Sequence, residues 1–356
     1  LRPRWGLPRA GEGCGATRSG RLSGMTQTLR LPMADCHDDL LMGVVHQQER
    51  GHRDPFGDYW LPQMREGGVV LTVLPIYTEE QFIGEGALRR SLRFVETAWD
   101  IADRHSDDVA LVTTATEMHE AIDGGRIALL LAFEGMEPVG HEVDLIDTFW
   151  RLGVRMASLT WNRRTPFADG LGERGTGAGL TELGVQAVER MERRGMIVDV
   201  SHLSDAGFDP VAKLATRPFV ASHTSCRDVF DHPRNLDDAR LHTIAEAGGF
   251  VGLNAMGEFL GQGSTVDVFL DHVEHAVRLI GTEHVGLGLD FLADTEAHSL
   301  PASAQPAPGF FIEGLERPSE LPAFGERLQQ RLGEDAARLV ASGTLIDALS
   351  RLLPSG

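Results

Sequence analysis

The segment Leu29-Arg-Leu-Pro-Met-Ala34 runs directly into Asp35-Cys36-His37-Asp38-Asp39, and this junction is the most informative stretch of the chain. The first segment is typical of a short buried strand. Because side chains of a strand alternate between its two faces, we expect His37 and Asp39 to point in the same direction. A neutral imidazole and a carboxylate are natural ligands of a divalent cation such as zinc. A single His-x-Asp triplet is common, so this interpretation depends on the residues at the ends of the other strands.

Length and charge limit the function classes. The chain has 356 residues, of which 42% are hydrophobic, and its formal net charge is −19. This length suits two average domains or one large α/β barrel. The acidic charge argues against nucleic acid or an anionic membrane as a partner. The sequence contains nothing close to the roughly eighteen uninterrupted apolar residues of a membrane span.

Cysteines and the N-terminal segment bear on location and domain organisation. Cys14, Cys36 and Cys226 are an odd, unpatterned set, so we expect no disulfide framework and a reducing, cytoplasmic location. Residues 1–24 are rich in arginine and glycine and lack the apolar region of a secretory signal. We interpret them as a disordered extension that precedes a single domain over residues 25–356. A homodimer is the candidate assembly.

Strand and helix patterns alternate along this domain. Predicted strands cover residues 69–77, 109–112, 127–133, 155–160, 196–200, 218–221, 250–254 and 284–289, and the main predicted helices cover 88–104, 145–152, 180–194, 205–215, 237–247, 266–280, 322–332 and 335–353. About eight strands joined by helices predict a parallel sheet closed into a (β/α)8 barrel. A loop follows the first strand at residues 47–57. The Pro- and Ala-rich stretch 300–309 is interpreted as a loop over the barrel mouth.

Residues that can bind a metal follow several of these strands. In chain order they are His37 with Asp39, Glu134, His202, His223 and Asp290. The carboxyl ends of barrel strands converge on the face that carries the active site. Each residue has an ordinary explanation as a helix start, a helix cap or a satisfied core histidine. Six ionisable groups buried around one point are costly unless cations compensate them, so together they predict a metal site. The other histidines, including His105, His242, His272 and His275, are interpreted as surface groups.

Seven motifs, taken together, resemble the renal (membrane) dipeptidase family of zinc peptidases. They are Asp35-Cys-His-Asp-Asp39, Phe133-Glu-Gly135, Leu159-Thr-Trp-Asn162, Asp199-Val-Ser-His202, Ser222-His-Thr-Ser225, Arg234-Asn-Leu-Asp-Asp238 and Gly286-Leu-Gly-Leu-Asp-Phe291. A similar tail comes after them in Arg317-Pro-Ser-Glu-Leu-Pro322 and Ser342-Gly-Thr-Leu345. The motifs occur in order through nearly the whole predicted domain, and their combination is specific although no single motif is.

The resemblance implies a (β/α)8 barrel that holds two zinc ions and hydrolyses the peptide bond of dipeptides. His37 and Asp39 would bind one ion, His202 and His223 would bind the other, and Glu134 would bridge the two. The physical interpretation of these residue types agrees, because paired cations supply a bridging hydroxide near neutral pH and polarise the scissile carbonyl.

Two further residues match positions of the family that act on the substrate. Asp290 matches its catalytic aspartate, which would accept the proton of the attacking water and pass it to the leaving amine. Arg234 matches the arginine that binds the terminal carboxylate of the substrate, and its planar fork suits that group. A surface arginine in a polar loop is the ordinary alternative for Arg234.

The chain departs from the family at Trp161. Animal members have a histidine there, thought to contact the substrate carbonyl, whereas an indole can neither accept a proton nor carry a positive charge. Either the metal alone polarises the carbonyl, or a neighbour such as Asn162, Arg163 or Arg164 substitutes. We therefore expect Trp161 and Asn162 to lie at the substrate and the substrate range to be narrower.

Two rival functions remain beside the dipeptidase. One is a metal-dependent hydrolase of an N-acyl amino acid or a lactam on the same barrel, and the other is a barrel that has lost catalysis and binds a ligand. The intact ligand set argues against the second rival. The only lysine, Lys213, lies in a predicted helix, which disfavours the related metallohydrolases that bridge their ions with a carbamylated lysine.

Overall fold

The computed structural model describes residues 30–261, 263–295 and 309–356. The predicted extension over residues 1–24 lies outside this part of the chain. The predicted loop over residues 300–309 lies outside it as well, except for Gly309.

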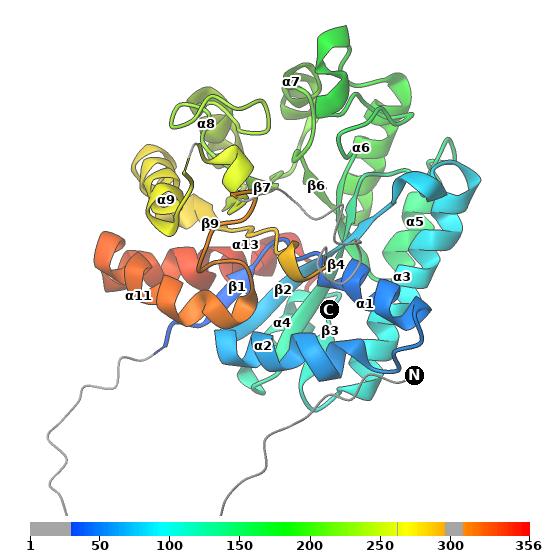
Figure 1. Ribbon diagram of the computed structural model, residues 1–356. Helices are drawn as coiled ribbons and strands as arrows, with labels where there is room; N and C mark the ends of the chain where they lie inside the picture. The colour runs from blue at the N-terminus through cyan, green and yellow to red at the C-terminus, as the bar shows by residue number, and fades with distance from the viewer. Residues whose placement is uncertain (1–29, 262, 296–308) are drawn as a thin grey trace, which may run out of the picture.

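Nine parallel strands form one sheet in the described residues (Figure 1). They are β1 (Met33–Asp35), β2 (Val69–Tyr77), β3 (Val109–Leu111), β4 (Ile127–Glu134), β5 (Val154–Ser158), β6 (Ile197–Asp199), β7 (Ala221–Thr224), β8 (Val251–Leu253) and β9 (Val285–Leu287). Their order is β6-β5-β4-β2-β1-β9-β8-β7, and β3 pairs with the first residues of β4. Two backbone hydrogen bonds join the ends of this order, from Val200 N to Val220 O at 2.8 Å and from Val220 N to Val198 O at 2.9 Å. The eight strands other than β3 form the predicted (β/α)8 barrel.

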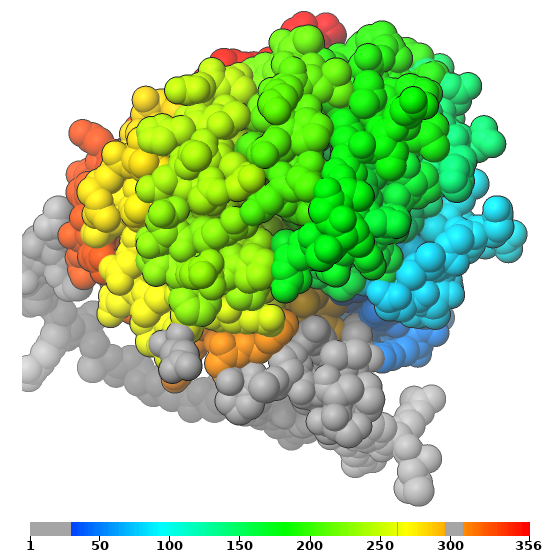
Figure 2. Space-filling model, turned by 90° about the horizontal axis from the view of Figure 1, so that it is seen from above, coloured from blue at the N-terminus to red at the C-terminus, as the bar shows by residue number. Residues whose placement is uncertain are grey.

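Helices surround the strands on the outside (Figure 1). Their bounds are α1 (Leu40–Glu49), α2 (Leu61–Gly67), α3 (Glu85–Arg104), α4 (Ala115–Asp123), α5 (Leu145–Arg151), α6 (Glu182–Arg194), α7 (Asp205–Leu214), α8 (Asp238–Glu246), α9 (Val266–Ile280), α11 (Leu321–Leu332), α12 (Glu334–Arg338) and α13 (Thr344–Leu352). Figure 2 shows the green to yellow segments that contain α6 to α9 packed side by side across the upper face. None of the described helices has the length and apolar character needed to cross a membrane.

The two faces of the strands pack against different apolar clusters. In β4, Leu129, Leu131 and Phe133 belong to the larger cluster, whereas Ala128, Leu130 and Ala132 belong to a smaller one. The smaller cluster combines residues of β1, β2, β4, β5 and β6 with Val220 and Phe250, which precede β7 and β8, and with residues of α4 and α13. We assign it to the barrel interior and the helices that close its amino-terminal end. Because side chains alternate along a strand, Glu134 follows Ala132 on the inner face. The strand pattern thereby places this carboxylate inside the barrel, at its carboxyl end.

The structure corrects the prediction around the first strand. β1 ends at Asp35, so His37 and Asp39 lie in the turn before α1, and strand alternation does not explain their common direction. The sequence analysis did not predict α1. Leu40, Leu41, Val44 and Val45 are all fully buried, and a helix that is apolar on several sides shows no amphipathic stripe. The predicted loop at residues 47–57 accordingly begins later, after Glu49.

Most other predicted strands and helices are confirmed within a few residues. One strand boundary and the burial of one histidine need correction. β7 covers Ala221–Thr224 rather than 218–221, so His223 lies inside the strand. His272 is a fully buried residue of α9 rather than a surface group, since its Nδ1 accepts a hydrogen bond from Cys226 N at 3.1 Å. Thr181 is the N-cap of α6, and its side-chain oxygen accepts a hydrogen bond from Gly184 N at 3.0 Å.

The chain after β9 passes so close to β7 that only glycine fits at position 288. A Cβ atom there would lie 2.0 Å from Ser222 O and 3.1 Å from His223 Cα, whereas at Gly286 the nearest atom, Leu345 Cβ, is 3.9 Å away. We expect Gly288→Ala to lower the free energy of unfolding by about 1–3 kcal/mol through overpacking. Gly286→Ala, the matched control, should change it by less than about 0.5 kcal/mol. Urea unfolding measures both, and equal stabilities of the two variants would contradict the close approach.

Candidate metal centre

Six acidic and imidazole side chains converge at the carboxyl ends of the barrel strands. They are His37 and Asp39 after β1, Glu134 at the end of β4, His202 after β6, His223 in β7 and Asp290 after β9. All except the half-buried Asp290 are buried. These are the six residues that the sequence analysis selected, and the structure brings them together around one point.

His37 lies at the centre of the carboxylates. Its Nε2 atom is 3.9 Å from Asp39 Oδ2, 3.8 Å from Glu134 Oε2 and 3.9 Å from Asp290 Oδ1. These distances are too long for hydrogen bonds, and this buried nitrogen has no hydrogen-bond partner among the described residues. Two ligands about 2.1 Å from one tetrahedral ion lie roughly 3.4 Å apart. The spacing therefore fits donors around a shared cation.

Hydrogen bonds determine the tautomers of the other two imidazoles. His202 Nδ1 lies 2.9 Å from Asn162 Oδ1, an oxygen that can only accept. His223 Nδ1 lies 2.8 Å from Ser222 Oγ, whose own proton is donated to Asp199 Oδ2. Both Nδ1 atoms are therefore donors, which leaves the Nε2 atom of each neutral ring unprotonated. The unprotonated nitrogen is the form that binds a metal.

These two unprotonated nitrogens face each other across a short distance. His202 Nε2 and His223 Nε2 are 2.9 Å apart, and Glu134 Oε1 lies 2.9 Å from the first and 3.7 Å from the second. Burial keeps the pKa of both imidazoles well below the usual value, so protons do not separate the lone pairs near neutral pH. Arg234 Nη2 donates to His202 Nε2 at 3.0 Å. A cation among these atoms would remove the repulsion, so the donor set fits a divalent metal.

The carboxylates of the centre repel one another when they are ionised. Burial raises the pKa of Glu134 well above its usual range, and the charge of Asp290 adds to the shift. Burial raises the pKa of Asp39 in the same way, with Glu134 as its next largest cause. Nearby cations favour the ionised form of a carboxylate. Divalent ions at this point would therefore offset both the carboxylate repulsion and the cost of burial.

Two of the converging residues hold strained backbone conformations. His202 has φ 67° and Asp290 has φ 61°, and no other non-glycine residue in the described ranges has a positive φ. Such conformations cost of order 1–3 kcal/mol each and cluster at functional sites. Both are held by main-chain hydrogen bonds, from Asp290 N to His37 O and from Leu171 N to His202 O, each 2.9 Å long.

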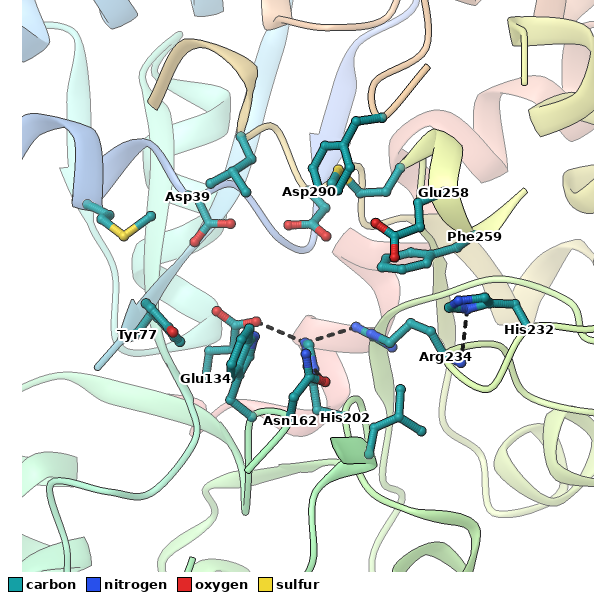
Figure 3. Close-up of a pocket in the computed structure, with 16 residues that line it drawn as sticks. Asp39, Tyr77, Glu134, Asn162, His202, His232, Arg234, Glu258, Phe259 and Asp290 are labelled. Carbon is teal, nitrogen blue, oxygen red and sulfur yellow. Dashed lines mark hydrogen bonds and ion pairs between the residues drawn. The ribbon is translucent and has the colours of Figure 1, made fainter. Parts of the chain in front are cut away.

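A cavity of about 380 Å³ opens over the centre (Figure 3). Its lining includes Asp39, Glu134, His202, Asp290, the three predicted substrate residues Trp161, Asn162 and Arg234, and in addition Met42, Tyr77, Leu171, His232, Met256, Glu258, Phe259, Leu292 and Phe310. His37 and His223 are not part of this lining. The cavity has room for a small ligand directly beside the candidate metal ligands.

Arg234 is a buried cation without an ion-pair partner. It is 5% exposed, none of the described carboxylates lies within salt-bridge distance of it, and its Nε atom has no hydrogen-bond partner in that part of the chain. Burial lowers the pKa of its guanidinium from the usual value. Uncompensated burial of a guanidinium is costly, so a carboxylate-bearing ligand in the cavity would meet a preformed site.

The structure adds residues that the sequence analysis missed. Asn254 Nδ2 donates to Asp290 Oδ2 at 2.9 Å, and Ser222 with Asp199 orients His223. Asn162 lines the cavity, and its side-chain oxygen accepts a hydrogen bond from the His202 ring. Asn254 is the last residue of a predicted strand, and Ser222 precedes the predicted ligand His223. Their positions in the sequence could therefore have indicated that they lie at the site.

Residues 26–343 match the membrane dipeptidase family, which is peptidase family M19. The chain belongs to this family. It is 33% identical over 207 residues to the dipeptidase verJ of Clonostachys rogersoniana, and the match covers 58% of this chain and 53% of verJ. It is 31% identical over 216 residues to an uncharacterized dipeptidase of Schizosaccharomyces pombe, covering 57% and 51% of the two chains. The match spans about half the length of both relatives.

Solved structures support the M19 fold. A metallo peptidase from Rhodobacter sphaeroides, liganded with a phosphinate mimic of the dipeptide L-Ala-D-Ala, has a TM-score of 0.80 at 26% identity, covering 91% of this chain and 99% of that one. Dipeptidase AC, a metallo peptidase of family M19, has a TM-score of 0.81 at 27% identity and covers 92% and 100%.

Metal content tests the centre directly. We expect protein purified with zinc to bind two ions per chain, and Glu134→Ala to lose at least one of them, because a bridging carboxylate contacts both ions. Glu120→Ala, which removes an exposed carboxylate of α4, is the matched control and should retain both. Elemental analysis measures the ions, and circular dichroism verifies the fold. Full metal retention in Glu134→Ala would contradict the bridging role.

Proposed function

We propose that this M19 member is a zinc-dependent dipeptidase. The observation that carries the proposal is the guanidinium of Arg234, which has no ion-pair partner among the described residues and lines the same cavity as Glu134, His202 and Asp290. A cation beside a candidate metal centre suits a small substrate with a free carboxylate close to its scissile bond. The dipeptide mimic bound to the Rhodobacter relative has this chemistry and supports the proposal.

In this proposal, His37 and Asp39 would hold one zinc ion, His202 and His223 would hold the other, and Glu134 would contact both. When bound, the two ions lower the pKa of a water molecule and polarise the scissile carbonyl. The chain's own contribution is to orient the donors. Asn162 and Ser222 do this for the imidazoles of His202 and His223 by accepting their Nδ1 protons, a kind of support on which metal affinity usually depends.

Asp290 moves the proton in the proposed reaction. Asn254 holds Oδ2 of this carboxylate, and Oδ1 faces the centre, 3.9 Å from His37 Nε2. A general base must reach the proton that it accepts, and the same group can then protonate the leaving amine. A carboxylate oxygen of Asp290 also lies within 4.8 Å of donor atoms of His37 and Asp39, so a role as a metal ligand is the alternative to be tested.

The two ends of the cavity suit the two ends of a dipeptide. Arg234 would bind the terminal carboxylate through its planar fork. On the opposite side, Tyr77 and Trp161 pack edge to face with ring centroids 5.2 Å apart (Figure 3 labels Tyr77). Burial raises the pKa of Tyr77 to about 12, so its hydroxyl stays protonated near neutral pH. We propose that this aromatic wall contacts the N-terminal residue, and that Trp161 restricts its size where animal members have a histidine.

A substrate panel tests the activity and the role of Arg234. We expect the wild type to cleave Ala-Ala and to cleave neither N-acetylalanine nor lactams at a comparable rate. Arg234→Met should lower kcat/KM for Ala-Ala by about 100-fold, because a charge-assisted contact with the free carboxylate is lost. Its effect on the corresponding dipeptide amide should be small. Faster cleavage of the N-acyl substrate by the wild type would favour the rival amide hydrolase.

The role of Asp290 can be separated from metal binding. We expect Asp290→Asn to lower kcat by about 10²–10⁴-fold while retaining the metal content and melting temperature of the wild type. Asp123→Asn, at the exposed end of α4, is the control and should match the wild type in kcat. Loss of zinc in proportion to activity would instead make Asp290 a ligand.

A further inference from the structure

A second charged group in the cavity is not used by the proposed reaction. Glu258 belongs to the short helix η4 (Gly257–Phe259) after β8, is exposed and lines the cavity. Among the residues that the structure describes, its carboxylate has no hydrogen-bond or ion-pair partner. Within the described residues, a carboxylate therefore faces the ligand space without an ion-pair partner.

Glu258 and Arg234 belong to one wall of the cavity. Asn235 Nδ2, next to Arg234 in the chain, donates to Phe259 O at 2.8 Å, which ties the segment after β7 to η4. The Arg234 guanidinium lies 5.8 Å from the centre of the Phe259 ring. Figure 3 shows Glu258 and Phe259 on the Arg234 side of the cavity, with Tyr77 on the opposite side.

The backbone around Glu258 is held in place on both sides. Gly257 N donates to Phe310 O at 2.9 Å, and Met256 N donates to Asn254 Oδ1 at 2.7 Å. Asn254 is also the residue that holds Asp290. The position of Glu258 is thereby fixed relative to the metal centre, which a specificity residue requires.

Charge balance indicates what Glu258 would bind. The cavity lining contains four carboxylates, Asp39, Glu134, Asp290 and Glu258, and one arginine, Arg234. In the proposed reaction the first three face two divalent ions, and Arg234 faces the substrate's terminal carboxylate. Glu258 is then the carboxylate that remains without an opposite charge. A cation on the substrate would supply one.

The geometry points to the C-terminal residue of the substrate as the source of that cation. Its α-carboxylate would lie at Arg234, on the same wall as Glu258, whereas the substrate's α-ammonium group lies beyond the scissile bond, toward the other wall. We infer that Glu258 selects dipeptides with a basic C-terminal side chain, arginine or lysine, and disfavours acidic ones. This inference rests on the proposed function, because it needs the terminal carboxylate at Arg234.

Two nearly isosteric substrates test the effect of the positive charge on the C-terminal side chain. Ala-Arg and Ala-citrulline differ chiefly in the positive charge of the side chain, and Ala-Glu carries the opposite charge. We expect the wild type to prefer Ala-Arg over Ala-citrulline by about three- to tenfold in kcat/KM, as for a solvent-accessible ion pair. The preference should shrink in 1 M NaCl. Glu258→Gln should abolish it and raise kcat/KM for Ala-Glu relative to Ala-citrulline.

Glu246→Gln is the matched control. Glu246 is an exposed last residue of α8, which leads back toward the start of β8 at the opposite end of the barrel, and its removal changes net charge equally. This variant should keep the wild-type preference for Ala-Arg. If Glu246→Gln lost the preference as Glu258→Gln does, the effect would be one of overall charge and the inference would be wrong.

The remaining outcomes separate the inference from the proposed function. If the wild type cleaves these dipeptides but Glu258→Gln keeps the ratio of Ala-Arg to Ala-citrulline, the inference fails and the proposed function stands. An equal fall in kcat/KM for all three substrates in Glu258→Gln would indicate that Glu258 binds the α-ammonium group of the substrate. That result would also contradict the inference. If the wild type cleaves no dipeptide at all, the proposed function fails and the inference fails with it.

Discussion

The constraint on which the rest of the structure depends is the electrostatic conflict around Glu134. One of its oxygens meets two unprotonated imidazole nitrogens, and the other lies beside His37 and the carboxylates that surround it. Neither set is stable by itself in a buried environment, because each concentrates lone pairs or like charges. Divalent cations would resolve both conflicts together, which would explain why the barrel holds so many ionisable groups at one end of its strands.

The surrounding scaffold keeps these mutually repelling side chains close together. Strained backbone at His202 and Asp290 directs two side chains inward, and the absence of a side chain at Gly288 lets the chain after β9 approach β7. The outer helices supply the apolar packing that offsets these local costs. Stability and the candidate metal centre therefore depend on different parts of the same barrel: the helix-facing layer stabilises the fold, and the strand ends hold the candidate metal ligands.

Much of this arrangement could be predicted from the sequence, for a physical reason. Alternating strand and helix patterns identify a parallel barrel, and barrel strands deliver their last residues to one face. Glu134 and Asp290 were therefore identifiable from their positions alone. The helix α1 was missed because its apolar residues lie on several sides, and His272 was missed because a buried, hydrogen-bonded histidine resembles a surface one in sequence. The tautomer-setting contacts of Asn162 and Ser222 depend on three-dimensional proximity, which no local pattern encodes.

The hydrogen bond from Asp290 N to His37 O has a consequence for how the protein is made. It joins the turn after the first barrel strand to the residue after the last one, so donors near the start of the chain cannot acquire their final partners until β9 has been synthesised. A nascent chain on the ribosome presents His37 and Asp39 long before Asp290 exists. The complete set of six converging side chains is accordingly assembled late in biogenesis, and chains that stop short of β9 cannot form it.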